Sequence, residues 1–279
     1  MAKQKENPKA GLPSGRVRVG IGGWIYAPWR GTFYPKGLPQ SQELSFAGTK
    51  LTSIEINATF YRLQTPATFR KWAAAVPDGF VFSLKGPRLI TNRGVLAESR
   101  DFMQRYFASG LSELGPRLGP LLWQFAPSKT FDEADFGKFL ELLPAQLGGR
   151  RLNHVVEVRH ASFRNPRFIQ LLRKFGVTVA FTDAAAWPSI ADMTGDIVYA
   201  RLQRGDDALE MAYPPTEIDA WATRTQGWAQ GRAPDDLPLL APAQAADAKP
   251  RDVFVYFIHE GKLRAPAAAM ALIERLKAA

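Results

Sequence analysis

Short runs of apolar residues, mostly β-branched and aromatic, recur along the chain, and amphipathic segments lie between them. Eight of these runs predict buried strands, because strands covered on both faces read as nearly continuous hydrophobic stretches. They lie at residues 17–24, 53–61, 80–86, 119–125, 154–160, 177–183, 196–203 and 252–260. The run HVVEVRH at 154–160 departs from the pattern, since Glu157 and Arg159 interrupt its valines.

The segments between the runs carry apolar residues at helical spacing, together with residues that begin and end helices. Asn165, for example, is a favourable N-cap, Pro166 suits the first turn, and Gly176 suits the end of the helix. We expect helices at 66–76, 98–114, 131–147, 165–176, 214–231 and 265–279, with short, weaker helices at 38–50 and 185–194.

Strands that alternate with helices predict parallel βαβ units. Eight units in 279 residues favour an α/β fold of a single domain, the (β/α)8 or TIM barrel, over an open doubly wound sheet. A dinucleotide-binding fold would need G-x-G-x-x-G after the first strand, whereas the sequence there is GIGGW followed by a loop. The barrel is expected at 16–279, after a disordered tail at 1–15 and with a flexible Pro- and Ala-rich insert at 232–251.

Alternation along each strand divides its side chains between the two faces of the barrel wall. If the β-branched and aromatic set faces the helices, the other set faces the interior. Most of the charged interior residues then lie near the C-terminal ends of their strands, where TIM barrels form active sites. The polar interior set is Glu55, Asn57, Lys85, Gln124, Glu157, Arg159, Asp183 and Arg201.

The charged members of this set support two interpretations. In the first, Glu157, Asp183 and Lys85 are catalytic: Glu157 is a general acid or base whose pKa is set by its cationic neighbours, and Asp183 is a second acid–base group or orients the first. Arg159 and Arg201 would hold negative charge as it develops. In the second, the same charges form a purely structural salt-bridge network, although burying charges is costly compared with apolar packing.

Two loops add candidates for anion binding. The seventh predicted strand leads into Arg204, and the eighth leads into Gly261 and Lys262 shortly before a helix begins. TIM barrels often bind phosphate at this place, beside a helix N-terminus. We therefore predict that Arg204, Gly261 and Lys262 bind an anion.

Aromatic residues gather after the first two predicted strands, with Trp24 and Tyr26 after the first and Tyr61 after the second. They are expected at the barrel mouth, where they either stack on a sugar or base or simply pack the loops.

Composition narrows the chemistry further. The absence of Cys excludes disulfides, thiolate metal sites and Cys nucleophiles. The three histidines, including His160 and His259 near the predicted mouth, have no spacing typical of a metal site, so a metal is not favoured and the cofactor is unknown. No G-x-S-x-G elbow supports a Ser-His-Asp hydrolase.

The formal net charge of +10 favours an anionic partner. Because the excess is scattered and no nucleic-acid-binding motif occurs, we expect a phosphorylated or sugar-like small molecule. Nucleic acid is the alternative partner, with a metal-dependent phosphodiesterase as the corresponding enzyme. The N-terminus lacks an apolar signal region, and no apolar run could cross a membrane, so we expect a cytoplasmic protein without membrane contact.

Several blocks of sequence follow one another in a recognisable order: GIGGWIYAPWRGTFYP, SIEINATFYRLQTPATFRKWAAAVPDGFVFSLKGP, LGPLLWQFAPS, VVEVRHASF, a strand that ends in Asp183, VYARL and VFVYF. Together they resemble the YecE-like family of uncharacterised proteins over about residues 17–231 and 252–276. The resemblance implies a TIM barrel but no reaction, so hydrolysis, isomerisation and lyase chemistry are not distinguished.

The polar positions that match the family include the charged set found by alternation. The residues predicted to bind substrate are Trp24, Tyr26, Glu55, Asn57, Tyr61, Gln124, Arg159, His160 and Arg201. The chain departs from the family pattern at two loops. Asn92 stands where the family has His, and Ile258-His259-Glu260 stands where Asn-Asn or Asn-Asp is usual.

Overall fold

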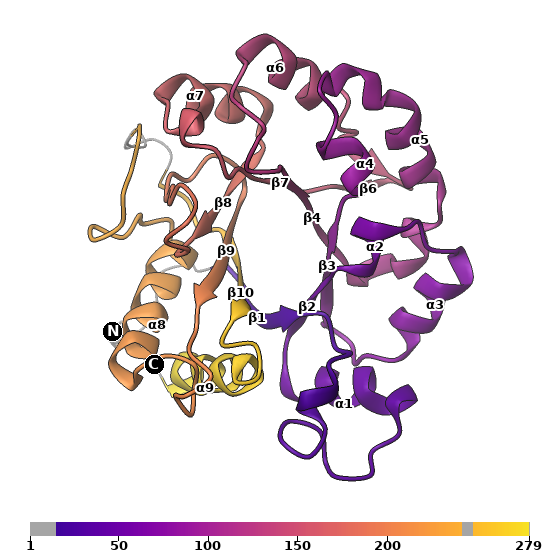
Figure 1. Cartoon of the computed structure of the whole chain (residues 1–279), viewed down its shortest axis with the longest axis vertical. Coiled ribbons are helices and arrows are strands. Elements are labelled where there is room, and N and C mark those ends of the chain that lie inside the picture. Colours follow the sequence, from indigo (N-terminus) through magenta and orange to yellow (C-terminus); the bar gives the residue numbers. More distant parts are fainter. Residues whose placement is uncertain (1–14, 242–247, 279) are drawn as a thin grey trace, which may run out of the picture.

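Each of the eight apolar runs corresponds to one strand of a single closed parallel barrel in the computed structural model, which describes residues 15–241 and 248–278 (Figure 1). Each strand pairs with its neighbours in chain order, and the last strand pairs with the first, Tyr256 opposite Gly20. The predicted TIM barrel is confirmed, and the open-sheet alternative is wrong. The strands are β1 (Val17–Gly22), β2 (Ser53–Ile56), β3 (Val81–Lys85), β4 (Leu118–Gln124), β7 (His154–Glu157), β8 (Thr178–Thr182), β9 (Ile197–Arg204) and β10 (Asp252–Glu260).

Helices follow the strands on the outside of the barrel (Figure 1). Their ends obey the sequence signals: the Asn165 side chain accepts a hydrogen bond from Arg167 N, and Gly176 ends that helix with a φ of 64°. The α-helices are α1 (Glu43–Lys50), α2 (Ala58–Tyr61), α3 (Pro66–Ala74), α4 (Arg88–Thr91), α5 (Arg100–Ala108), α6 (Glu133–Glu141), α7 (Pro166–Phe175), α8 (Pro215–Ala229) and α9 (Ala265–Ala278).

Shorter elements complete the chain. Single 3-10 segments lie at Ala27–Trp29, Gln40–Gln42, Leu96–Ser99, Leu111–Arg117 and Ala161–Phe163. Two short strands, β5 (Gln146–Leu147) and β6 (Arg150–Arg151), pair with each other outside the barrel.

The helix predicted at 185–194 is wrong, because the segment between β8 and β9 is irregular. Pro188 removes a backbone donor there, which disfavours a helix. The buried carboxylate of Asp192 instead accepts hydrogen bonds of 2.8 Å from both Leu240 N and Ala241 N. The flank of the 232–251 insert is thereby tied to this segment. The predicted flexibility of the insert stays a prediction, since 242–247 lie outside the described residues, as does the tail at 1–14.

The barrel wall separates two sets of buried side chains. Val156 and Val198 belong to the large core between the strands and the helices. Val155 and Tyr199, each one residue away, belong to a second cluster inside the barrel. Alternation therefore assigned the two faces of β7 and β9 correctly. The apolar interior cluster gives way to charged residues toward the C-terminal ends of the strands, and this transition forms the floor of the candidate site.

In the part of the chain that the structure describes, no helix combines the length and apolar character needed to cross a membrane.

Close approach of β1 to β2 depends on Gly20, because a Cβ there would lie 1.9 Å from the carbonyl oxygen of Ser53. We expect Gly20→Ala to lower the free energy of unfolding by about 3 kcal/mol, since the clash is with backbone in a closed barrel. Gly94→Ala is the matched control, because a Cβ at Gly94 meets nothing within 4 Å. Its effect should stay within about 1 kcal/mol. Equal denaturation midpoints for both variants would contradict the register of β1 and β2.

Candidate active site at the barrel mouth

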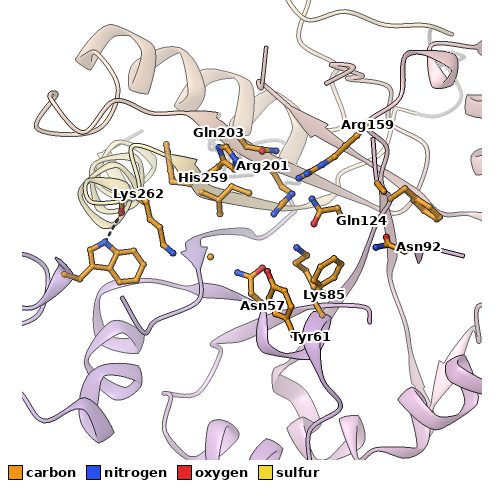
Figure 2. Close-up of a pocket in the computed structure, with 18 residues that line it drawn as sticks. Asn57, Tyr61, Lys85, Asn92, Gln124, Arg159, Arg201, Gln203, His259 and Lys262 are labelled. Carbon is orange, nitrogen blue, oxygen red and sulfur yellow. Dashed lines mark hydrogen bonds between the residues drawn. The ribbon is translucent and has the colours of Figure 1, made fainter. Parts of the chain in front are cut away.

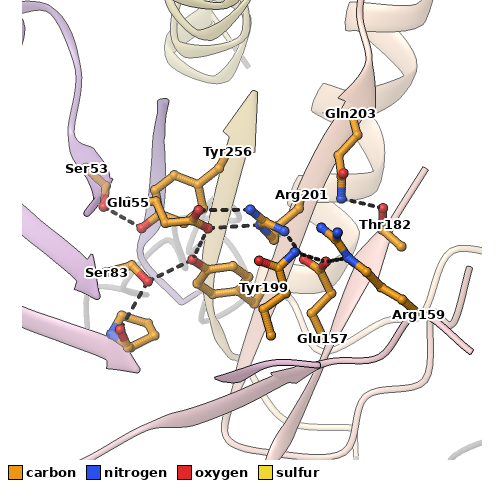
Figure 3. Close-up of polar contacts among 12 residues, drawn as sticks. Ser53, Glu55, Ser83, Glu157, Arg159, Thr182, Tyr199, Arg201, Gln203 and Tyr256 are labelled. Atoms are coloured by element: carbon orange, nitrogen blue, oxygen red, sulfur yellow. Dashed lines mark hydrogen bonds and ion pairs between the residues drawn. The ribbon is translucent and has the colours of Figure 1, made fainter. Parts of the chain in front are cut away.

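Arg201 is the centre of the charged residues inside the barrel (Figure 3). Its Nε and Nη2 donate to the two carboxylate oxygens of Glu55, each at 3.0 Å, and its Nη1 binds Glu157. Both carboxylate side chains are fully buried, and the Arg201 side chain is 5% exposed. The planar guanidinium therefore joins β9 to β2 on one side and to β7 on the other, with the bidentate geometry that suits Arg and a carboxylate.

Glu157 has no oxygen left without a partner. Its Oε1 accepts hydrogen bonds from Arg159 Nε at 2.7 Å and from Gln124 Nε2 at 3.0 Å, while Oε2 faces Arg201. Burial alone would raise the pKa of Glu157, but Arg201 and Arg159 outweigh it and lower the pKa to about 2. A carboxylate that stays ionised and fully paired is a poor general acid or base. The surroundings of Glu157 therefore fit the structural interpretation better than the catalytic one.

Hydroxyl groups complete the coordination of Glu55. Tyr199 OH donates to Glu55 Oε2 at 2.7 Å and lies 2.7 Å from the hydroxyl of Ser83 (Figure 3). A second pair, Ser53 and Tyr256, lies alongside with its hydroxyls 2.6 Å apart. These contacts satisfy polar groups that would otherwise be buried without partners. Ser53, Ser83 and Tyr256 were not among the predicted site residues, although alternation along β2, β3 and β10 places them inside.

A cavity of about 550 Å³ opens above this network (Figure 2). None of its lining residues is acidic. Four of them are cationic, and their side chains converge on the cavity from different strands and loops (Figure 2). The charged and polar lining residues are Asn57, Lys85, Asn92, Gln124, Arg159, Arg201, Gln203, His259 and Lys262, and the aromatic ones are Trp29, Phe60, Tyr61, Phe125 and Phe257.

Three of the four cations lie over aromatic rings. Lys85 Nζ is 4.0 Å from the centre of the Phe60 ring, and Lys262 Nζ is 4.4 Å from that of Tyr26. The Arg159 guanidinium lies 4.4 Å from the ring centre of Trp187. Aromatic faces attract cations without neutralising them. The rings therefore hold Lys85 and Lys262 at the mouth while leaving their charge available to a ligand, whereas Arg159 is also paired with Glu157.

Lys85 ends β3 on the floor of the cavity and is 6% exposed. Within residues 15–241 and 248–278, its amine makes no hydrogen bond or ion pair. Burial, followed by the nearby Arg201, lowers the pKa of Lys85 to about 8, although Glu55 and Glu157 partly oppose the shift. The neutral form of this amine is therefore more populated near neutral pH than that of an exposed lysine. Such a perturbed, unpaired group in a cavity is typical of functional sites.

The structure does not bring Asp183 together with Glu157 and Lys85. Asp183 follows the interior residue Thr182, so alternation turns it away from the cavity, which it does not line. Its carboxylate accepts hydrogen bonds from Gln203 N and, at 3.0 Å, from Tyr213 OH. Burial raises the pKa of Asp183, against these hydrogen bonds. Asp183 thus fixes the backbone of Gln203, which does line the cavity.

Of the three residues predicted to bind an anion, Lys262 lines the cavity, and Arg204 and Gly261 do not. Arg204 is paired with Glu217 at 2.6 Å outside the cavity. The amide groups that precede α9 are already occupied, because the Asp207 carboxylate accepts from Leu263 N at 2.9 Å and from Arg264 N at 3.3 Å. Gly261 packs against Gly205, where an added Cβ would lie 2.5 Å from a backbone carbon.

Other predicted binding residues lie beside the cavity rather than in its lining. Trp24 packs edge-on against Trp72 at 5.3 Å, and Tyr26 supports Lys262. His160 accepts a hydrogen bond from Ser162 N and caps the short turn that follows β7. Glu55 lies beneath the floor. Asn57, Tyr61, Gln124, Arg159 and Arg201 line the cavity as predicted.

Three polar lining residues, Asn92, Gln203 and His259, were missing from the predicted set. Gln203 follows Arg201 by two positions on β9, so alternation places it inside. His259 has a φ of 69° and lies where the pairing of β10 with β9 shifts between Phe257 and Glu260. Tyr256 and Ile258 face the interior, so alternation would turn residue 259 outward. The shift in pairing is a β-bulge, which can change the direction of a side chain, and His259 lines the cavity. For Asn92 and His259, the one available signal was the departure of their loops from the family pattern.

No three His, Asp or Glu residues gather into a group that could hold a metal ion within the described ranges 15–241 and 248–278.

The closed barrel, with its polar cavity at the C-terminal ends of the strands, defines a protein of the TIM-barrel class. The chain belongs to the family described as protein of unknown function DUF72, whose model matches residues 18–279. The resemblance expected from the sequence blocks is therefore confirmed.

Known relatives agree with this assignment. The chain is 27% identical to the UPF0759 protein YecE of Escherichia coli K12 over 150 residues, which cover 53% of this chain. The matched region spans about half the length of that curated relative, 50%.

Solved structures match over nearly the whole chain. A DUF72 family protein from Thermotoga maritima MSB8 matches with a TM-score of 0.68 at 22% identity, covering 94% of this chain and 98% of its own. A DUF72 family protein from Enterococcus faecalis V583 also has a TM-score of 0.68, at 16% identity, with 94% and 95% covered. SacUVDE matches with a TM-score of 0.53 at 11% identity, covering 95% and 98%. These structures share the barrel fold with this chain.

Replacing Glu157 by Gln should lower the free energy of unfolding by about 3–5 kcal/mol at neutral pH, because two guanidinium groups lose the charge that compensates them. The pKa of Glu157 is lowered from 4.5 to about 2. Its stabilising contribution is therefore present above pH 4.5 and is lost as the pH falls toward 2. Urea denaturation should show the difference between wild type and variant shrinking across that interval.

Lys85→Met is the contrasting variant. The pKa of Lys85 is lowered from 10.5 to about 8, so its protonated form destabilises the fold at neutral pH. That penalty disappears as the pH rises from 8 toward 10.5. Lys85→Met should match or exceed wild type in stability at pH 7. A loss of several kcal/mol would instead place Lys85 in the structural network.

Proposed function

We propose that the chain is an enzyme that binds an anionic small molecule, phosphorylated or sugar-like, in the barrel-mouth cavity and acts on it by acid–base chemistry at Lys85. The observation that carries this proposal is the charge of the cavity. Four cations and no carboxylate line it. The nearby buried carboxylates, Glu55 and Glu157, are already paired with Arg201 beneath the floor.

The charges around the cavity do not balance. Lys85, Arg159, Arg201 and Lys262 contribute four positive charges when Lys85 is protonated, and Glu55 and Glu157 contribute two negative ones, which leaves 4 − 2 = +2. A partly enclosed surplus of this kind attracts an anion and strengthens its binding. The cavity volume of about 550 Å³ is within the range of small-molecule sites.

Neutral groups supply the contacts that a hydroxylated substrate needs. Gln203 lines the cavity, and its buried Oε1 has no hydrogen-bond partner among the described residues. Asn57 adds an amide to the lining, and Phe60 and Tyr61 add aromatic faces. Lys85 populates both protonation states near neutral pH, which suits a general acid or base.

Nucleic acid is the second candidate ligand. Tyr61 is 67% exposed, and the Arg88 guanidinium lies 5.8 Å from its ring centre. An exposed aromatic ring beside a cation can stack on a base and contact a phosphate. The small molecule is favoured because the convergent cations lie within the cavity rather than along an extended surface path.

Calorimetric titration with inorganic pyrophosphate and a panel of sugar phosphates tests the proposal. We expect Lys262→Met to weaken binding by about tenfold, or about 1.4 kcal/mol, because it removes a cation from the lining. Lys36→Met is the control, since Lys36 is exposed and does not line the cavity. This variant should bind the phosphate compounds with the same affinity as wild type.

Two results would contradict the small-molecule proposal. One is the absence of binding by the whole phosphate panel at low salt. The other is binding of single-stranded RNA or DNA that pyrophosphate does not displace. In that case the logarithm of the binding constant should fall against the logarithm of the salt concentration with a slope of several units. The second result would favour nucleic acid.

A further inference from the structure

We propose that the Lys85 amine forms a covalent imine with an aldehyde or ketone carbonyl of the anionic ligand. The substrate class is then a phosphorylated or carboxylated carbonyl compound. This inference rests on the proposed function, because the same cavity must bind the anion. It goes further in making Lys85 a nucleophile.

The placement of Lys85 is that of a reactive amine rather than of a counterion. Its stem is held at the end of β3, and the face of Phe60 covers one side of the ammonium group at 4.0 Å. The amine points into the cavity between Asn57 and Gln124 (Figure 2). The structure gives it no acceptor among the described residues, so a bound carbonyl would not have to displace a protein contact.

The charges that face Lys85 keep its amine available. Arg201 on β9 and Arg159 after β7 disfavour its protonation, while Glu55 on β2 and Glu157 on β7 favour it. Both carboxylates bind Arg201 directly, which limits their effect on Lys85. Lysine nucleophiles are commonly activated in this way, by desolvation and a neighbouring cation.

The chemistry balances with one proton taken from solvent. The lone pair of the neutral amine attacks the carbonyl carbon, and the π electrons move to the carbonyl oxygen. A proton passes from nitrogen to oxygen to give a carbinolamine. The nitrogen lone pair then forms the carbon–nitrogen double bond as the carbon–oxygen bond breaks. The hydroxide leaves as water with a proton taken from solvent, and a protonated imine remains. Its single positive charge equals that of protonated Lys85, so the site already accommodates it.

Reductive trapping tests this step. Wild type, Lys85→Met and Lys262→Met would be incubated with pyridoxal 5′-phosphate, an anionic aldehyde, and sodium cyanoborohydride, and the modified lysines mapped by peptide mass spectrometry. We expect Lys85 to be labelled at least about tenfold faster than the exposed Lys36 and Lys277, because more of its amine is neutral. The rate should rise with pH and level off above about 8.

The outcomes separate this inference from the proposed function. Fast labelling of Lys85 that inorganic pyrophosphate slows, and that is slower in Lys262→Met than in wild type, supports both. If Lys85 is labelled only as fast as Lys36 in a protein that binds pyrophosphate, the proposed imine is contradicted. The proposed anion site is not affected by that result. If Lys85 is labelled fast, but pyrophosphate neither binds the protein nor slows the labelling, the proposal that the substrate is an anion is contradicted. Because the label is mapped in wild type, the test does not depend on the folding of Lys85→Met.

Discussion

The contact of Arg201 with two buried carboxylates is the interaction on which the site depends. A guanidinium in the middle of a barrel is costly unless its donors are satisfied, and Glu55 and Glu157 satisfy them from β2 and β7. The three side chains occupy the level at which the apolar filling of the barrel ends. They therefore form a rigid polar floor across the barrel where an apolar layer would otherwise lie. Arg159 and Gln124 complete the shell around Glu157.

The same pairing determines the charge of the space above it. Because Glu55 and Glu157 face Arg201, the cavity is left with cations held by aromatic rings and with no acidic side chain in its lining. Lys85 is the group most affected. It is close enough to Arg201 for its pKa to be lowered, and no described residue pairs with it. The interior charges thus serve two purposes: Arg201 and its carboxylates build the floor, and Lys85 faces the ligand.

Much of this arrangement follows from a strand period of two, which is why the sequence alone predicted eight strands and placed Glu55, Lys85, Glu157 and Arg201 inside the barrel. The ion pairs inside the barrel could not be predicted from the sequence, because they depend on distances between side chains on different strands. Asp183 lies one residue past Thr182 and so turns away. The bulge in β10 turns His259 in, and the Asp207 carboxylate from a neighbouring loop occupies the amides before α9. Each difference arises from a local break in regularity or from a long-range contact.

The central claim is that Arg201 holds both carboxylates and so leaves Lys85 as an unpaired amine in a cationic cavity. The pKa of Lys85 tests this most directly, measured by NMR titration of protein labelled with ¹³C at lysine Cε, with Lys85→Met to assign the resonance. The account predicts a pKa of about 8. A value at or above 10.5, the usual value for lysine, would mean that a carboxylate pairs with Lys85 instead, and would contradict it.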